Sequence, residues 1–136
     1  GKPSIYYGSE FAIEGEKKPY ADEILRPELK IEDYKDAVTT NENTKMIAAL
    51  GNMRLNNQWV GEAGYRELLL TNRQYAFLRE YGDKRLVAIV NNDDNNADIN
   101  LNIGGRFTEL FSGETRNFDG NTHVNIPGNS GQVWIG

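Results

Sequence analysis

The chain has 136 residues and a mass of 15.3 kDa, enough for one ordinary domain or for a small domain with an appendage. It has no cysteine and one histidine, which excludes a disulfide scaffold, a thiolate metal site and a multi-histidine zinc site within one chain. The net charge of −5 argues against nucleic-acid binding, and no apolar run approaches the about 20 residues of a membrane-spanning helix. We expect no cofactor, no metal, no nucleic-acid partner and no membrane partner.

The first 43 residues are charged and irregular. Residues 4–7 predict a short strand, and residues 14–20 predict a loop because they are rich in glycine, proline and charge. Arg26 precedes Pro27, which favours an extended or turn conformation at Arg26. The segment between this strand and the next element is about 30 residues long, and loops of that length are usually functional or disordered.

A helix is predicted over residues 43–55, because four apolar residues recur at the spacing of one helical face. They are Met46, Ile47, Leu50 and Met53. Asn43 or Thr44 is the predicted N-cap, and two asparagines at 56 and 57 end the helix. We place the domain boundary there, with one part over residues 1–57 and the other over residues 58–136.

In the second part, residues 58–136, the apolar residues recur at the two-residue spacing of β-strands. Short β-rich segments alternate with turns that contain glycine, asparagine and aspartate, a pattern typical of an antiparallel β-sandwich. The predicted strands cover residues 75–79, 86–90, 99–103, 108–111, 123–126 and 132–135.

Several polar groups are candidates for a catalytic or metal-binding site. Glycosidases use paired carboxylates, but spacing alone does not separate the acids at positions 10, 14, 22 and 23 from solvated surface acids, which is the favoured interpretation. Residues 91–95 resemble an oxygen-rich calcium loop without its glycine and final glutamate, so a turn is favoured. His123 is interpreted as a polar residue on a strand face.

Aromatic side chains could stack against sugars. The candidates are Trp59, Tyr65, Tyr75, Phe77, Phe107, Phe111 and Trp134. Most fall at alternating strand positions, where core packing is the commoner explanation, and Trp134 is predicted to be core. Trp59 lies in the connector, where an exposed platform and inter-domain packing are equally favoured.

Residues 3–10, Pro-Ser-Ile-Tyr-Tyr-Gly-Ser-Glu, resemble the last barrel strand of the α-amylase family, glycoside hydrolase family 13. That family ends its eighth strand with Gly-x-Pro-x-Ile-Tyr-Tyr-Gly-x-Glu, and Lys2 departs from it by occupying a position that is usually apolar. The similarity continues in register to residues 133–135 and covers essentially the whole chain. Within the family, the chain looks closest to cyclomaltodextrinase, neopullulanase and related α-amylases.

The resemblance implies a mainly β fold, an antiparallel β-sandwich of the amylase C-terminal type at 58–136. It is preceded at 1–57 by the last strand, long loop and last helix of a (β/α)8 barrel. The chain opens without a methionine, so we expect a piece of a larger protein. The family's catalytic aspartates and glutamate lie on earlier barrel strands, which implies that no residue here is catalytic. The parent is expected to be a retaining α-glucan hydrolase, and this chain alone is expected to be inactive.

The resemblance also suggests substrate contacts. The loop after the eighth strand reaches the substrate face of the barrel, which makes Arg26 the best candidate contact to a sugar hydroxyl, oriented by Asp22 or Glu23. A salt bridge between loop and barrel is equally favoured. Trp59 is the third candidate, and Tyr6 is expected to pack within the barrel.

Three functions remain in competition. The favoured one is the C-terminal portion of a hydrolase of starch, maltodextrin or cyclodextrin, with the sandwich as a scaffold that covers the barrel. The alternatives are an autonomous carbohydrate-binding module using Trp59 or Tyr65, and a structural domain without a ligand. The expected partners are the rest of the barrel and the parent's α-glucan substrate. The sequence decides neither whether the protein forms a homodimer nor whether it is bacterial cytoplasmic or secreted. Residues 62–136 are predicted to form the stable unit, with 1–42 mobile or repacked.

Overall fold

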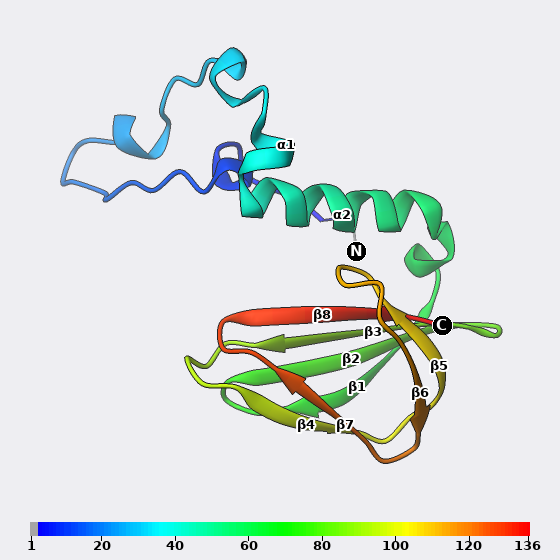
Figure 1. Cartoon of the computed structure of the whole chain (residues 1–136). Coiled ribbons are helices and arrows are strands. Elements are labelled where there is room, and N and C mark those ends of the chain that lie inside the picture. The colour runs from blue at the N-terminus through cyan, green and yellow to red at the C-terminus, as the bar shows by residue number, and fades with distance from the viewer. Residues whose placement is uncertain (1–2) are drawn as a thin grey trace. The chain divides into compact units, whose positions relative to one another are not determined.

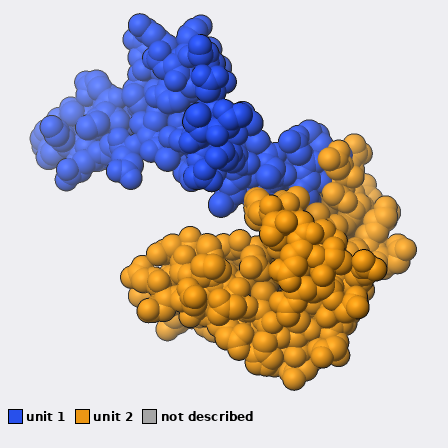
Figure 2. Space-filling view, in the orientation of Figure 1, with its two compact units in different colours: residues 1–55 blue, residues 56–136 orange. Residues whose placement is uncertain are grey.

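The computed structural model describes residues 3–136, so Lys2, the departure from the strand motif, lies outside the described residues. The chain divides into two compact units, Gly1–Leu55 and Asn56–Gly136 (Figure 2). The division lies two residues before the boundary expected from the sequence. None of the helices in residues 3–136 is long and apolar enough to cross a membrane.

The first unit consists of short helices, irregular segments and one long helix (Figure 1). Its elements are η1 (Ser9–Phe11), η2 (Glu23–Leu25), η3 (Ile31–Tyr34), α1 (Ala37–Thr40) and α2 (Glu42–Asn56). The strand predicted at residues 4–7 is wrong, since these residues form no ladder with any strand in the described chain. A strand exists only when a neighbour accepts and donates its backbone hydrogen bonds.

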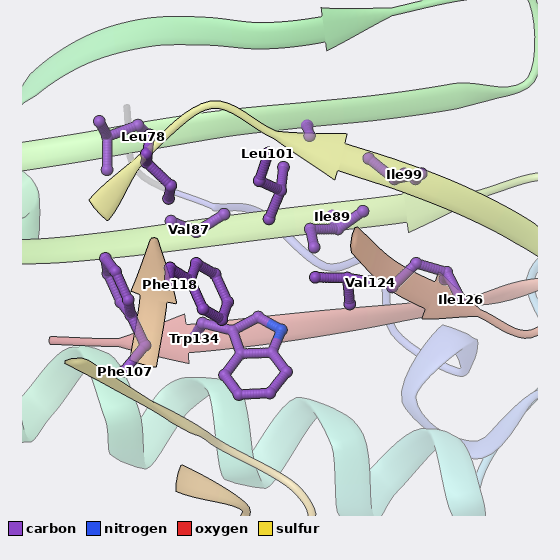
Figure 3. Close-up of a cluster of buried hydrophobic side chains, with 12 residues drawn as sticks. Leu78, Val87, Ile89, Ile99, Leu101, Phe107, Phe118, Val124, Ile126 and Trp134 are labelled. Carbon is purple, nitrogen blue, oxygen red and sulfur yellow. The ribbon is translucent and has the colours of Figure 1, made fainter. Parts of the chain in front are cut away.

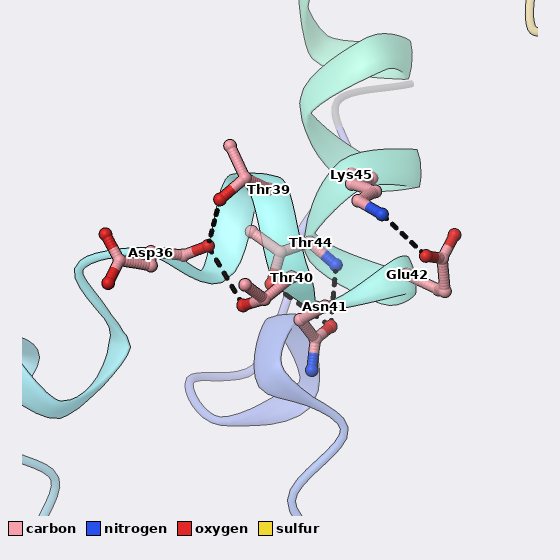
Figure 4. Close-up of polar contacts among 7 residues, drawn as sticks. All are labelled: Asp36, Thr39, Thr40, Asn41, Glu42, Thr44 and Lys45. Atoms are coloured by element: carbon pink, nitrogen blue, oxygen red, sulfur yellow. Dashed lines mark hydrogen bonds and ion pairs between the residues drawn. The ribbon is translucent and has the colours of Figure 1, made fainter.

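The long helix α2 begins one residue before the predicted start and has a different cap. Asn41 is the N-cap, because its side-chain oxygen accepts a hydrogen bond from the backbone N–H of Thr44 at 3.0 Å (Figure 4). Its amide nitrogen donates to the carbonyl of Phe11, also at 3.0 Å. The predicted caps Asn43 and Thr44 are therefore corrected: both lie inside the first turn, and one side chain joins the helix start to the N-terminal segment.

The second unit begins with a 3₁₀ turn, η4 (Gln58–Gly61), and continues as eight strands. The strands are β1 (Gly64–Leu70), β2 (Gln74–Tyr81), β3 (Lys84–Asn91), β4 (Ala97–Leu101), β5 (Gly104–Glu109), β6 (Thr115–Asp119), β7 (Thr122–Ile126) and β8 (Ser130–Ile135). The sequence missed β1 and β6, which are the two edge strands of the large sheet. β6 contains one apolar residue, Phe118, and the register of β1 shifts between Glu67 and Leu69, so neither strand shows an unbroken apolar alternation.

The strands form two antiparallel sheets that face each other. The large sheet has the order β1-β2-β3-β8-β5-β6, and β4 pairs with β7 in the small sheet (Figure 1). The predicted fold class, a mainly β antiparallel sandwich after a helical N-terminal region, is confirmed.

One hydrophobic core fills the space between the sheets (Figure 3). Trp134 is 1% exposed and its ring lies 5.3 Å from that of Phe118, which confirms Trp134 as core. The small sheet contributes alternate residues of β4 and β7, such as Ile99 and Val124. All members of this core cluster belong to the second unit.

Candidate functional site

A pocket of about 520 Å³ lies within the first unit. Its walls come from three stretches of chain between residues 6 and 27. Asp22 and Arg26, two of the three site residues predicted from the sequence, line this pocket together with Tyr6 and Tyr7. The structure thus brings Asp22 and Arg26 into one site.

The 3₁₀ turn η2 places these two side chains. The backbone N–H of Leu25 donates to the carbonyl of Asp22 at 3.0 Å, and that of Arg26 donates to the carbonyl of Glu23 at 3.1 Å. Asp22 therefore stands immediately before the turn and Arg26 immediately after it. Pro27 follows and prevents the turn from continuing as a helix.

The ion pairs in the pocket differ from the predicted pairing of Arg26 with Asp22 or Glu23. Asp22 forms an ion pair with Lys17 at 3.3 Å rather than orienting Arg26. Both partners are about two-thirds exposed, at 65% and 68%, so the pair contributes little to stability. Within residues 3–136, no ion pair joins Arg26 to either predicted orienting carboxylate, Asp22 or Glu23. The guanidinium is left exposed at the pocket wall, with its donors available to a ligand.

The pocket combines hydrogen-bonding groups with aromatic surface. Arg26 and Lys17 supply donors, Asp22 and Glu14 supply acceptors, and the tyrosines supply rings and hydroxyls. This combination suits a ligand that carries many hydroxyl groups. Lys17 is the residue that sequence reasoning missed, because its pairing with Asp22 depends on how the intervening loop folds back.

Trp59, the third predicted site residue, lies elsewhere. It belongs to η4 in the second unit, is half-buried, and donates its indole N–H to the side-chain oxygen of Asn57 at 3.1 Å. It is not among the residues that line the pocket.

The other polar candidates from the sequence lie outside the pocket wall, and most of them have hydrogen-bond partners within the fold. Asn91, at the start of the calcium-like loop, is 1% exposed and fully used in holding that loop. His123 is exposed on β7 and its Nδ1 lies 2.7 Å from an oxygen of Asp98. Over residues 3–136, no three histidine, cysteine or acidic side chains come together as a metal site. Glu10 differs, since its Oε2 is buried without a hydrogen-bond partner.

Three aromatic residues of the sandwich gather on its surface. The ring of Phe77 lies 5.9 Å from that of Tyr65 and 5.7 Å from that of Tyr75, with tilts of 37° and 40°. The hydroxyls of Tyr65 and Tyr75 are hydrogen-bonded to each other, which raises the pKa of Tyr65 to about 12. The sequence named these three residues but could not group them, because their proximity follows from the pairing of β1 with β2.

Comparison with known proteins finds a similarity within the second unit. Residues 70–135 match the family model described as the alpha amylase C-terminal all-beta domain. These residues make up most of the second unit. Among curated proteins, none matches the chain.

Solved structures extend the similarity to nearly the whole chain. An Anoxybacillus α-amylase matches 96% of it at 20% identity with a TM-score of 0.75. The α-amylase of Geobacillus thermoleovorans, solved with acarbose, matches 96% at 16% identity with a TM-score of 0.75. A Nostoc punctiforme debranching enzyme matches 98% at 19% identity with a TM-score of 0.68. The chain spans only 28%, 28% and 26% of these proteins, and at such identities the likeness shows the fold alone.

Proposed function

We propose that the chain is the C-terminal portion of an α-glucan hydrolase of the α-amylase family. In this proposal residues 1–57 complete the catalytic barrel, and residues 58–136 form a scaffold that covers it. The subfamily suggested by the sequence is that of cyclomaltodextrinases and neopullulanases.

The observation that carries this proposal is the contrast between the two units. The first unit exposes large apolar side chains, while every member of the core cluster lies in the second. The exposed set comprises Ile5, Tyr6, Tyr7, Tyr20, Ile24, Leu25, Ile31, Val38, Met46 and Leu55. A segment of this composition loses apolar burial when it stands alone, which is expected of a piece of a larger domain.

Two further observations support the proposal. The motif at residues 3–10 resembles the end of a barrel strand, and residues 70–135 match the model of the alpha amylase C-terminal all-beta domain. The buried, unpartnered carboxylate oxygen of Glu10 is also consistent with a missing neighbour that would supply a hydrogen-bond donor. Asp22, Arg26 and Trp59 are proposed as substrate contacts of the complete enzyme, and the catalytic carboxylates are proposed to lie outside this chain.

The test compares this chain with the full-length protein that contains it. We expect the full-length protein to release reducing sugar from maltoheptaose, and the 136-residue chain to release none. In the full-length protein, Arg26→Ala is expected to raise KM for maltoheptaose about tenfold, as for a lost charged hydrogen bond of about 1.4 kcal/mol. A full-length protein without α-glucan hydrolase activity would contradict the proposal.

The alternative function is an autonomous carbohydrate-binding module. The grouping of Tyr65, Tyr75 and Phe77 on the sandwich surface favours it, because sugar rings stack on exposed aromatic faces. Amide chemical shifts of the 136-residue chain, recorded with and without maltoheptaose, distinguish the two. Shifts confined to these three residues would favour the module, and an unchanged spectrum would favour the scaffold.

A further inference from the structure

Tyr20 is the most exposed large apolar residue within residues 3–136, at 107% of its reference area. It lies in the segment between η1 and η2, which doubles back as an open loop (Figure 1, blue). Its neighbours between residues 14 and 23 are charged residues, one glycine, one proline and one alanine. The chain therefore presents a single aromatic ring to water in the middle of a charged segment.

The backbone holds Tyr20 in a conformation that a tyrosine rarely adopts, with φ at 60°. Lys18 and Ala21 form an isolated antiparallel bridge, and the N–H of Ala21 donates to the carbonyl of Lys18 at 3.3 Å. Pro19 is thus the second residue of a tight turn and Tyr20 the third, where type II turns usually carry glycine or asparagine. A bulky side chain at positive φ costs stability, which points to a use of the ring beyond the turn.

The turn stands at the wall of the pocket in the first unit. Lys17 and Asp22 flank the turn, both line the pocket, and their ion pair at 3.3 Å closes the base of the turn. Tyr20 is two residues from Asp22, so their Cα atoms are at most about 7 Å apart. Tyr20 is not itself a lining residue, which places it beside the rim of the pocket.

From this geometry we infer that Tyr20 is a stacking platform for an outer sugar residue of an α-glucan whose inner residues occupy the pocket. The C–H face of a pyranose ring packs on an aromatic ring, while its hydroxyls suit the polar groups of Lys17, Asp22 and Arg26. A pocket of about 520 Å³ has the size of a site for a drug-sized ligand, so a longer glucan extends past its rim. The inference rests on the proposed function, because it takes an α-glucan as the ligand.

Two other uses of the ring fit the structure less well. Packing against the rest of a barrel suits clustered rings such as Tyr6 and Tyr7, whose centroids lie 5.0 Å apart. Burial of Tyr20 in the same way would also desolvate the charged side chains of Glu16 and Lys18 beside it. A second copy of the chain would gain only one ring, far less area than a stable dimer buries.

The test uses three variants of the full-length protein. Tyr20→Asn removes the ring and suits the positive φ, whereas Tyr20→Phe keeps the ring. Lys18→Ala is the matched control, because it changes an exposed side chain of the same turn and keeps the backbone hydrogen bond. KM is measured for maltoheptaose and for maltotriose, and thermal unfolding is recorded for each variant.

We expect Tyr20→Asn to raise KM for maltoheptaose about tenfold and to leave KM for maltotriose nearly unchanged, since only the longer glucan reaches the ring and covers its apolar face. Tyr20→Phe and Lys18→Ala should leave both KM values unchanged, and Tyr20→Asn should not lower the unfolding temperature. An unchanged KM for maltoheptaose in Tyr20→Asn would overturn the inference, and a lower unfolding temperature beside it would assign the ring to packing. An equal rise for both substrates would also overturn it, because damage to the loop acts on both.

The same variants separate this inference from the proposed function. A full-length protein that cleaves maltoheptaose with the same KM in the presence and absence of the ring keeps the proposed function and loses the platform. If the full-length protein does not cleave maltoheptaose, titration calorimetry measures its Kd for this sugar. A Kd raised by Tyr20→Asn would retain the platform and refute the assigned activity, and an unchanged Kd would overturn both.

Discussion

Asn91 joins three segments of the sandwich through a single side chain. Its amide nitrogen lies within hydrogen-bond distance of the carbonyls of Asn95, Ile126 and Pro127, at 2.8, 3.2 and 3.0 Å. Its oxygen accepts from the side chain of Gln74 at 2.9 Å. Because Asn91 is 1% exposed, water cannot replace these partners.

Asn91→Ala is therefore expected to lower the free energy of unfolding by about 2–3 kcal/mol, since buried carbonyls lose their donor. Urea unfolding followed by tryptophan fluorescence measures this change. The exposed neighbour gives the control: Asn92→Ala is expected to change stability by less than about 0.5 kcal/mol. Equal effects of the two substitutions would show that the side-chain network has no special role.

The hydroxyl pair of Tyr65 and Tyr75 predicts a pH dependence at high pH. The hydrogen bond from Tyr75 is the largest cause of the raised pKa of Tyr65, about 12 against an ordinary 10.0. A raised pKa in the folded state means that the stabilisation by this bond is fully present below pH 10.0 and is lost as the pH rises through about 12.

We expect Tyr75→Phe to bring the pKa of Tyr65 back toward 10.0, as read from the pH dependence of the NMR signals of the Tyr65 ring. Tyr81→Phe removes a tyrosine from the same strand but not from the pair, so it serves as the control. A titration of Tyr65 that is the same in both variants would rule out the hydroxyl pair as the cause.

At the scale of elements, the helix start gives a test of local structure. In the full-length protein, Asn41→Ala removes the cap of α2 and its bond to Phe11, which is expected to lower the free energy of unfolding by about 1 kcal/mol and to increase amide exchange in the first turn. Asn43→Ala changes an exposed residue inside the helix, where alanine is the better helix former. Asn43→Ala should leave amide exchange in the first turn unchanged or slightly slower. Faster exchange in this variant would instead place the cap at residue 43, as the sequence suggested.

The elements also show which structure could be predicted from the sequence. β3 and β8 were found because central strands must be apolar, and α2 was found because its apolar residues repeat at helical spacing. β1 and β6 were not found, since β6 has a single apolar residue and a register shift interrupts β1. The predicted strand at residues 4–7 failed for a different reason: its local sequence favours a strand, but strand formation depends on a partner that the described chain lacks.

At the scale of the whole molecule, the candidate site was predicted in part. Asp22 and Arg26 were named and do line one pocket, because a single 3₁₀ turn separates them. The pairing of Asp22 with Lys17 was not foreseen, since it depends on the path of an irregular loop that no sequence period describes. Trp59 was named as a third substrate contact, with inter-domain packing equally favoured, and it lies in the other unit.

We propose that the sandwich folds by itself, while residues 3–55 need the rest of a barrel. Residue-resolved amide exchange of the 136-residue chain, compared with the full-length protein, tests it most directly. We predict strong protection of β2, β3 and β8 in both proteins, and protection of residues 4–42 only in the full-length protein. Strong protection throughout residues 4–42 in the 136-residue chain would contradict the account.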